Sequence, residues 1–216
     1  MIKHILFDFD GVICESVHIK TEAFYEMYLP YGTEIAQKVK AHHLANGGMS
    51  RFDKFKYYET ELLGKEMTQT RMQELSAQFS ALVKKKVIDA PFVPGALAFL
   101  QNDSQAYNCF IVSATPMEEM LEIAEAKAIT GYFKMICGSP TGKSEWGSYL
   151  VKEYGLNPEE TLFIGDAKND YIAAEANRFH FLWRKTDVPA DIPDSVPWVS
   201  DLSSLHTLLT DADYFR

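Results

Sequence analysis

Residues 3–12, KHILFDFDGV, place a short run of apolar side chains directly before two aspartates and a glycine. The apolar run at residues 5–7 is continuous, which is typical of a parallel strand covered on both faces. Asp8 and Asp10 are two residues apart, so their side chains project to the same side of an extended chain. Because like charges held together are costly without a counter-ion, the pair indicates a divalent metal site at the end of this strand.

The composition is that of an acidic globular protein. The chain has 216 residues, of which 47% are hydrophobic and 24% charged, and its formal net charge is −9. This length suits one large domain or one domain with an insertion, and the acidic balance disfavours nucleic acid and anionic membranes as partners. The N-terminus does not resemble a cleavable leader, and no stretch approaches about 18 apolar residues, so we expect a cytoplasmic protein.

Residues 15–87 differ in composition from the rest of the chain. They are rich in lysine, glutamate, glutamine, methionine and aromatic residues, and their apolar side chains recur at helical spacing. Beyond Pro94 and Gly95 the pattern alternates, with strands expected at 109–112, 134–137, 162–164 and 180–183 and helices at 96–102, 117–127, 145–154, 171–177 and 202–209. Such alternation predicts an α/β fold. We expect a Rossmann-like parallel-sheet core, residues 1–14 and 88–216, with an inserted α-helical cap, residues 15–87.

Polar side chains follow four of the expected strands. They are Asp8 and Asp10, then Ser113, Ala114 and Thr115, then Lys143 after a short loop, and finally Asp166 with Asp170. Each feature alone is typical of turns and helix caps. Ligands of parallel sheets, however, bind outside the carboxyl ends of the strands, so the four groups together predict one site at that edge.

This constellation resembles the haloacid dehalogenase-like hydrolase superfamily, in its phosphoglycolate phosphatase and β-phosphoglucomutase branch with a helical cap. The motifs stand in family order: DFDGV at 8–12, VSAT at 112–115, Lys143, and GDAKND at 165–170. The resemblance implies that Asp8 is the nucleophile and Asp10 the general acid/base. It also implies a phosphoryl site made by Ser113, Ala114 and Lys143, and a Mg²⁺ site made by Asp8, the Asp10 carbonyl and Asp166, with Asp170 orienting the metal shell or Lys143.

The implied roles agree with elementary chemistry. A carboxylate is a weak nucleophile toward a phosphate dianion, since both are negative, and a metal ion and a lysine reduce that repulsion. We therefore expect a Mg²⁺-dependent phosphatase that hydrolyses a small phosphorylated metabolite, either a sugar phosphate or a phospho-organic acid, through an aspartyl-phosphate. The protein is expected to be a monomer or a homodimer.

A sugar phosphomutase is the main alternative. Residues 47–51, GGMSR, resemble the specificity loop of β-phosphoglucomutase-like proteins, in which a cap arginine grips a second phosphate. Arg51 is therefore the expected cap contact to substrate, in a helix that Ser50 caps. Against a mutase, GDAKND resembles the phosphatase version of the last motif.

Other functions are less well supported. Residues 138–144, GSPTGKS, lie between an expected strand and helix, as a nucleotide-binding loop does, but have three residues between the glycines where that loop has four. A non-catalytic relative would usually lack one of the charged residues, and none is missing. Lys20 could replace the Schiff-base lysine of phosphonoacetaldehyde hydrolases, but Asp10 argues against that chemistry. His42 and His43 are expected on a helix surface without a chemical role.

Overall fold

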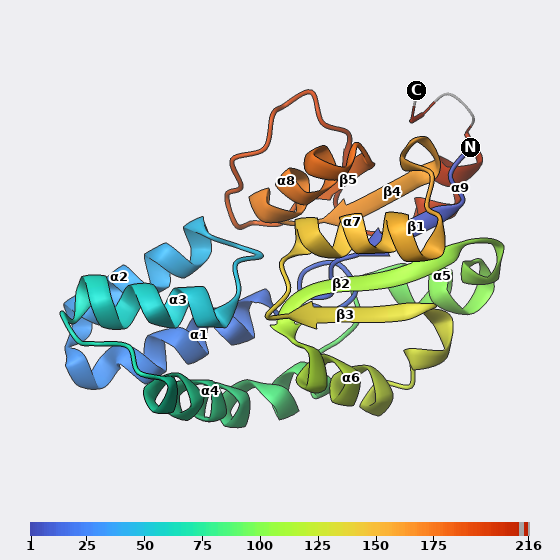
Figure 1. The fold of residues 1–216 in the computed structure, drawn as a ribbon. Coiled ribbons are helices and arrows are strands. Elements are labelled where there is room, and N and C mark those ends of the chain that lie inside the picture. Colours follow the sequence, from blue (N-terminus) through green and yellow to red (C-terminus); the bar gives the residue numbers. More distant parts are fainter. Residues whose placement is uncertain (212–213, 216) are drawn as a thin grey trace.

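The computed structural model describes residues 1–211 and 214–215 and contains a six-stranded parallel sheet. The strands are β1 (His4–Phe7), β2 (Asn108–Pro116), β3 (Met135–Ser139), β4 (Thr161–Gly165), β5 (His180–Arg184) and β6 (Trp198–Val199). Their order in the sheet is β3-β2-β1-β4-β5-β6 (Figure 1). This arrangement confirms the predicted α/β, Rossmann-like fold, and it places the DFDGV strand at the centre.

Alternate side chains of each strand pack on opposite faces of the sheet. Ile5 and Phe7 of β1 belong to one apolar cluster, whereas Leu6 between them belongs to the other. The first face is covered by α5 (Ala96–Asn102), α6 (Met117–Ala126) and α9 (Leu205–Thr210), and the second by α7 (Lys143–Tyr154) and α8 (Lys168–Asn177). A sheet buried on both faces explains why its strands are continuous apolar runs.

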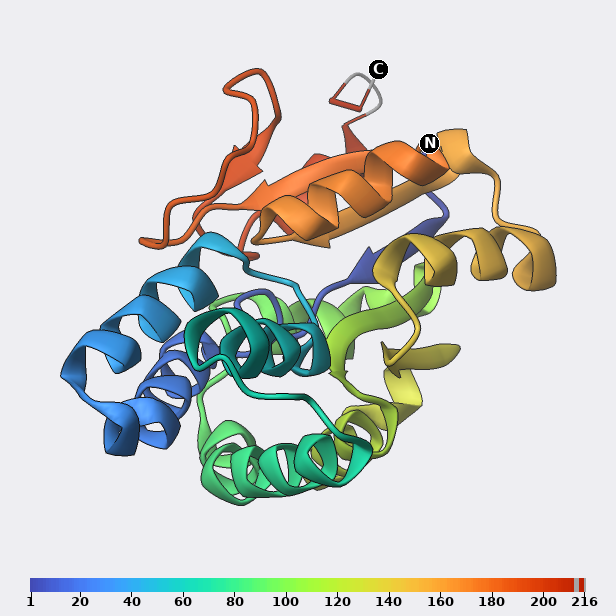
Figure 2. The ribbon, with the colours of Figure 1, turned by 60° about the vertical axis from the view of Figure 1, so that its left-hand side comes forward.

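Four helices between β1 and β2 form a separate group beyond the carboxyl ends of the strands, and we refer to them as the cap (Figures 1 and 2). They are α1 (Val17–Tyr28), α2 (Thr33–Ala45), α3 (Arg51–Tyr57) and α4 (Gln69–Asp89). Aromatic rings fill the interior of the cap, and those of Phe24 and Phe79 lie 4.2 Å apart between centroids. Large aromatic side chains supply much buried apolar area in so small a group of helices.

The two chain connections between cap and core lie side by side. The backbone N–H of Glu15 donates to the carbonyl of Pro91, and that of Val93 donates to the carbonyl of Ile13. Short 3₁₀ turns at Leu29–Tyr31, Ser104–Ala106, Thr130–Tyr132 and Pro158–Glu160 and a π turn at Tyr58–Leu62 complete the elements. In the described part of the chain, no helix has the length and apolar character needed to span a bilayer.

Differences from the sequence-based boundaries fall near the site. β2 continues to Pro116, four residues beyond its expected end, because β3 still pairs with it there across a register shift. Helices α7 and α8 begin at Lys143 and Lys168, earlier than expected. In each case a carboxylate in the first turn, Glu145 or Asp170, accepts a hydrogen bond from the backbone N–H of the N-cap residue and so stabilises the start of the helix. Strand β6 was not predicted, because two residues are too few to show a periodic pattern.

Candidate active site

The central position of β1 creates the crevice in which the motif residues meet. The chain leaves β1 for β2 on one side and later returns to β4 on the other, so the strand order reverses at β1. Parallel α/β sheets bind ligands at such a reversal, outside the carboxyl ends of the strands. The register aligns Phe7 with Ile111 of β2 and with Ile164 of β4, so the polar residues that follow these three strands lie close together.

Three carboxylates form a buried acidic cluster at this point. Oxygens of Asp8, Asp166 and Asp170 lie within 4.8 Å of one another. Burial raises the pKa of Asp8 to about 7 and that of Asp166 well above its usual range, and neighbouring carboxylates add to both shifts although Lys143 opposes them. Buried carboxylate oxygens at this spacing are the donor set that a hard divalent cation takes. The cluster therefore fits a metal ion.

Two glycines allow the carboxylates to approach so closely. A Cβ on Gly11, whose φ is +77°, would lie 2.3 Å from Oδ2 of Asp166. A Cβ on Gly165 would lie 2.2 Å from the Cβ of Asp170. Any larger residue at either position would push an aspartate out of the cluster, and at Gly11 it would also be strained by the left-handed backbone.

Lys143 supplies the positive charge next to the cluster. Its Nζ lies 2.9 Å from Oδ2 of Asp8 and 2.5 Å from Oδ1 of Asp170. Burial alone would lower the pKa of this ammonium, but the two carboxylates outweigh burial and raise it. Asp170 also accepts the backbone N–H of Ala167, so it holds both the lysine and the start of α8. Of the two roles expected for Asp170, orienting the metal shell or Lys143, the contact with Lys143 is present, and both roles stay predictions.

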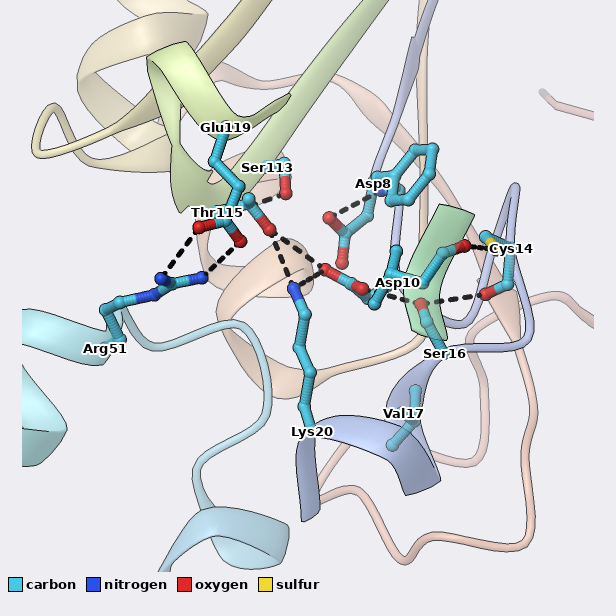
Figure 3. Close-up of polar contacts among 12 residues, drawn as sticks. Asp8, Asp10, Cys14, Ser16, Val17, Lys20, Arg51, Ser113, Thr115 and Glu119 are labelled. Atoms are coloured by element: carbon cyan, nitrogen blue, oxygen red, sulfur yellow. Dashed lines mark hydrogen bonds and ion pairs between the residues drawn. The ribbon is translucent and has the colours of Figure 1, made fainter. Parts of the chain in front are cut away.

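The carboxylate of Asp10 points toward Ser16 and Lys20 (Figure 3). It accepts hydrogen bonds from Ser16 Oγ at 2.6 Å, from Lys20 Nζ at 2.5 Å and from Thr115 Oγ1 at 3.3 Å. Burial tends to raise the pKa of Asp10, but the charge of Lys20 and the hydrogen bonds from Lys20 and Ser16, with a smaller effect of Lys143, together outweigh burial and lower the pKa. The carboxylate of Asp10 is therefore held ionised, and its carbonyl is the part that could reach a metal ion.

Ser16, Lys20 and Thr115 were not identified from the sequence as partners of Asp10. A signal was available, because Ser16 and Lys20 are four residues apart at the start of α1 and so lie on one side of it. Lys20 Nζ donates to Thr115 Oγ1 at 2.7 Å as well as to Asp10. These contacts connect the first cap helix to two strand ends.

The predicted acidic residues and the predicted phosphoryl-binding residues line two adjoining hollows. Asp8, Asp10, Ala114 and Asp166 line a cavity of about 90 Å³ beneath the cap. Ser113 and Lys143 line a wider groove beside it, which shares Ala114 with the cavity. The Oγ of Ser113 accepts the backbone N–H of Thr115 at 3.1 Å, so its hydroxyl hydrogen is available to another acceptor.

Arg51 lies at the boundary between cap and core. Its guanidinium donates to both carboxylate oxygens of Glu119 on α6, at 2.9 and 2.6 Å, and to Ser80 on α4 at 2.7 Å (Figure 3). It also lies over the ring of Phe79, 4.7 Å from the centroid. Although Arg51 lines the cavity, three of its five donors are engaged. Its role as a substrate contact stays a prediction, while its role in joining cap to core is visible.

His43 does not lie on the helix surface as expected. It shares the apolar face of α2 with Ala36 and Val39, and only 7% of it is exposed. Its Nδ1 is 2.9 Å from Nζ of Lys54, which is also buried and also lines the cavity. Burial lowers the pKa of His43 well below its usual value and that of Lys54 to about 7, and nearby cations add to both shifts. No sequence pattern indicated this pair, because Lys54 stands in a charged run typical of an exposed helix.

With this geometry established, comparison with known proteins places the chain in a family. The model for haloacid dehalogenase-like hydrolases matches residues 5–183. The chain belongs to this family. The match covers all four motifs and the cap, and it confirms the resemblance drawn from the motifs.

Curated relatives are bacterial phosphatases. Phosphoglycolate phosphatase 1 of Pseudomonas aeruginosa is 26% identical over 183 residues, which cover 80% of this chain and 65% of that protein. The phosphoglycolate phosphatase of Haemophilus influenzae is 25% identical over 187 residues, 81% of each chain. This chain thus spans less than two thirds of the Pseudomonas protein and about four fifths of the Haemophilus protein.

Two solved structures illustrate the shared fold. A haloacid dehalogenase-like hydrolase of Bacillus subtilis, solved with bound magnesium, superposes with a TM-score of 0.71 at 18% identity, covering 97% of this chain and 99% of that one. The β-phosphoglucomutase of Clostridium difficile superposes with a TM-score of 0.70 at 16% identity, covering 95% and 93%. At these identities the likeness establishes the shared fold alone.

Proposed function

We propose that this protein is a Mg²⁺-dependent phosphatase that hydrolyses a small phosphomonoester through an aspartyl-phosphate on Asp8. The placement of Asp8 supports this function most directly, since its carboxylate belongs to the acidic cluster and also contacts the Lys143 ammonium. Asp8 and Asp166 are proposed as metal ligands, together with the carbonyl of Asp10. Bound there, Mg²⁺ would offset the repulsion between the carboxylates and the phosphoryl oxygens.

In the first step, an oxygen of Asp8 attacks phosphorus and the bond between phosphorus and the ester oxygen breaks. Lys143 stabilises the charge on the phosphoryl oxygens, and Ser113 and the backbone at Ala114 orient the group for in-line attack. The leaving oxygen takes a proton from the carboxyl of Asp10. The alcohol then departs, and the phosphoryl group remains on Asp8.

In the second step, water attacks the phosphorus atom of the aspartyl-phosphate. Asp10 takes the water proton, the bond between Asp8 and phosphorus breaks, and inorganic phosphate leaves. The ionised form of Asp10 is the one this step needs, and the Lys20 and Ser16 contacts favour that form. In the first step, by contrast, the same carboxyl must carry the proton that goes to the leaving oxygen.

Phosphoglycolate is the first substrate to test, because curated relatives are named for its hydrolysis. The small cavity beneath the cap also favours a leaving group of a few non-hydrogen atoms. A sugar phosphomutase is not favoured. Its expected second-phosphate ligand, Arg51, is engaged by Glu119, and the β-phosphoglucomutase likeness is one of fold.

Phosphate release from p-nitrophenyl phosphate and phosphoglycolate, with and without Mg²⁺, tests this function. We expect activity that needs the metal and falls by at least about 10³-fold in Asp8→Asn. Asp194→Asn is the matched control, since Asp194 is an exposed aspartate outside the site. Acid quenching of a reaction with radiolabelled substrate should trap label on the wild-type protein and none on Asp8→Asn. Metal-independent turnover, or full activity of Asp8→Asn, would contradict the mechanism.

A further inference from the structure

Lys54 and His43 lie on the cap side of the cavity, apart from the four family motifs. Lys54 is 3% exposed and His43 is 7% exposed, and both line the cavity. The Lys54 amine contacts His43 Nδ1 at 2.9 Å and lies 5.6 Å from the centroid of the Phe24 ring. The amine therefore faces an aromatic ring, a neutral imidazole and the interior of the cavity.

Lys54 differs from the other cations that line the cavity because it has no carboxylate partner among residues 1–211 and 214–215. The others are each paired: Lys20 with Asp10, Arg51 with Glu119, and Lys168 with Asp191. The one polar contact of Lys54 within that same part of the chain is with His43, which carries no negative charge. The cavity thus has a buried amine on its cap side that contacts no carboxylate among the described residues, and Asp10 and Asp166 act on it only at longer range.

Holding a lysine in this position is unfavourable for the fold. A buried cation is costly unless an anion and hydrogen bonds compensate for its lost hydration, and an apolar side chain of similar length would avoid that cost. An anion in the cavity would compensate for it during binding. The phosphoryl group is expected beside Lys143 on the core side, so an anion near Lys54 would belong to the other end of the substrate.

We propose that Lys54, held in place by His43, binds a carboxylate on the leaving group, and that the substrates are phosphate esters of small hydroxy acids. This inference rests on the proposed phosphatase function and adds to it the residue that would select a leaving group with a carboxylate, such as that of phosphoglycolate. A cavity of about 90 Å³ accommodates an acid of two or three carbons beside the phosphoryl group. The phosphoryl group is then recognised by the core, and the carboxylate by the cap.

The matched probes are phosphoglycolate and its primary amide, which have the same shape but differ by the charge of the carboxylate. We expect wild-type kcat/KM to be at least about 100-fold higher for phosphoglycolate, as for a charged group that binds a buried partner. Lys54→Met should lower this ratio about 30-fold or more. Lys56→Met is the matched control, because Lys56 is an exposed lysine on the same helix, and it should leave the ratio unchanged.

Binding of the free acid gives a second measurement that does not depend on turnover. Glycolate at millimolar concentration should raise the Tm of the wild-type protein, glycolamide should not, and the glycolate effect should be lost in Lys54→Met. Met retains the buried aliphatic length of Lys54, and Lys54→Gln provides a second variant if Met does not fold. Lys54→Arg, which keeps the charge, should retain more of the preference than Met does.

The outcomes separate this inference from the proposed function. If both esters are hydrolysed and Lys54→Met leaves their kcat/KM ratio unchanged, Lys54 does not recognise the carboxylate. Equal stabilisation of wild type and Lys54→Met by glycolate, or none of either, would overturn the inference in the same way. If no phosphate ester is hydrolysed but glycolate still binds through Lys54, the proposed phosphatase function fails while the anion site stands.

Discussion

The two sides of the cavity hold their charges differently. On the core side, the Lys143 ammonium contacts two carboxylates, those of Asp8 and Asp170. On the cap side, Lys20 and Arg51 are paired with Asp10 and Glu119, whereas the one polar contact of Lys54 among residues 1–211 and 214–215 is with the ring of His43. The core side is thus assembled before any substrate arrives, whereas the cap side is completed by the substrate under our proposal. We propose that the reaction takes place on the core side and that Lys54 on the cap side selects the substrate.

Replacing Lys143 should cause the largest loss of activity among the substitutions that remove a charge from the core side. Lys143→Met leaves the buried carboxylates without their neighbouring cation and removes the group expected to stabilise the transferring phosphoryl oxygens. We expect kcat/KM for p-nitrophenyl phosphate to fall about 10³-fold, equivalent to about 4 kcal/mol. Lys152→Met, an exposed lysine on the same helix, is the control and should retain full activity. Comparable activity of the two variants would contradict the role given to Lys143.

The ion pair between Arg51 and Glu119 tests whether a paired charge at the boundary serves stability or recognition. Arg51→Met leaves Glu119 buried and uncompensated, and we expect the free energy of unfolding to fall by about 3 kcal/mol in denaturant titrations. In the double variant with Glu119→Leu, most of that loss should be recovered. Activity on phosphoglycolate and on p-nitrophenyl phosphate should change by the same factor. A selective loss of phosphoglycolate hydrolysis would instead support Arg51 as the predicted substrate contact.

Gly11 tests how tightly the core side is packed. Gly11→Ala places a Cβ against Asp166 and in a left-handed conformation. Gly64→Ala is the matched control, because Gly64 has a φ of +61° and nothing within 4 Å of the added Cβ. We expect Gly64→Ala to cost about 1 kcal/mol in unfolding free energy, and Gly11→Ala to cost about 2 kcal/mol more and to weaken Mg²⁺-dependent activity. Equal costs would show that Asp166 moves aside freely.

The pH dependence of stability should reveal the unpaired amine directly. Because the pKa of Lys54 is lowered to about 7 in the folded protein and is about 10.4 when unfolded, the unfolded chain binds one more proton between these values. The wild type should therefore gain stability relative to Lys54→Met as pH rises from about 7.5 to 9.5, by about 1 kcal/mol per pH unit. The charged and titratable groups around Lys54 are His43, Lys20, Asp10, Lys143 and Asp166. A constant difference between the two proteins would contradict a buried, uncompensated Lys54.

Much of the core could be predicted because its signals are local in sequence. Continuous apolar runs indicated strands β1 to β5, and the polar residues at their ends indicated the edge that carries the site. Ser50 does cap α3 as expected, accepting the backbone N–H of Asp53. The predicted limits of cap and core are consistent with the helices between β1 and β2 and stay a prediction.

The sequence alone determined the sheet, its catalytic edge and the order of the motifs, because strand patterning and strand-end residues are set by neighbours in the chain. Only the tertiary structure decided which charges meet. Arg51 reaches Glu119 across 68 positions, and Lys20 reaches Thr115 across 95. His43 and Lys54 became buried because α2 packs against α1 and α3 packs against α4 within the cap, and in the described part of the chain this packing brings no carboxylate into contact with Lys54. Such pairings depend on how distant elements pack, and no local pattern encodes them.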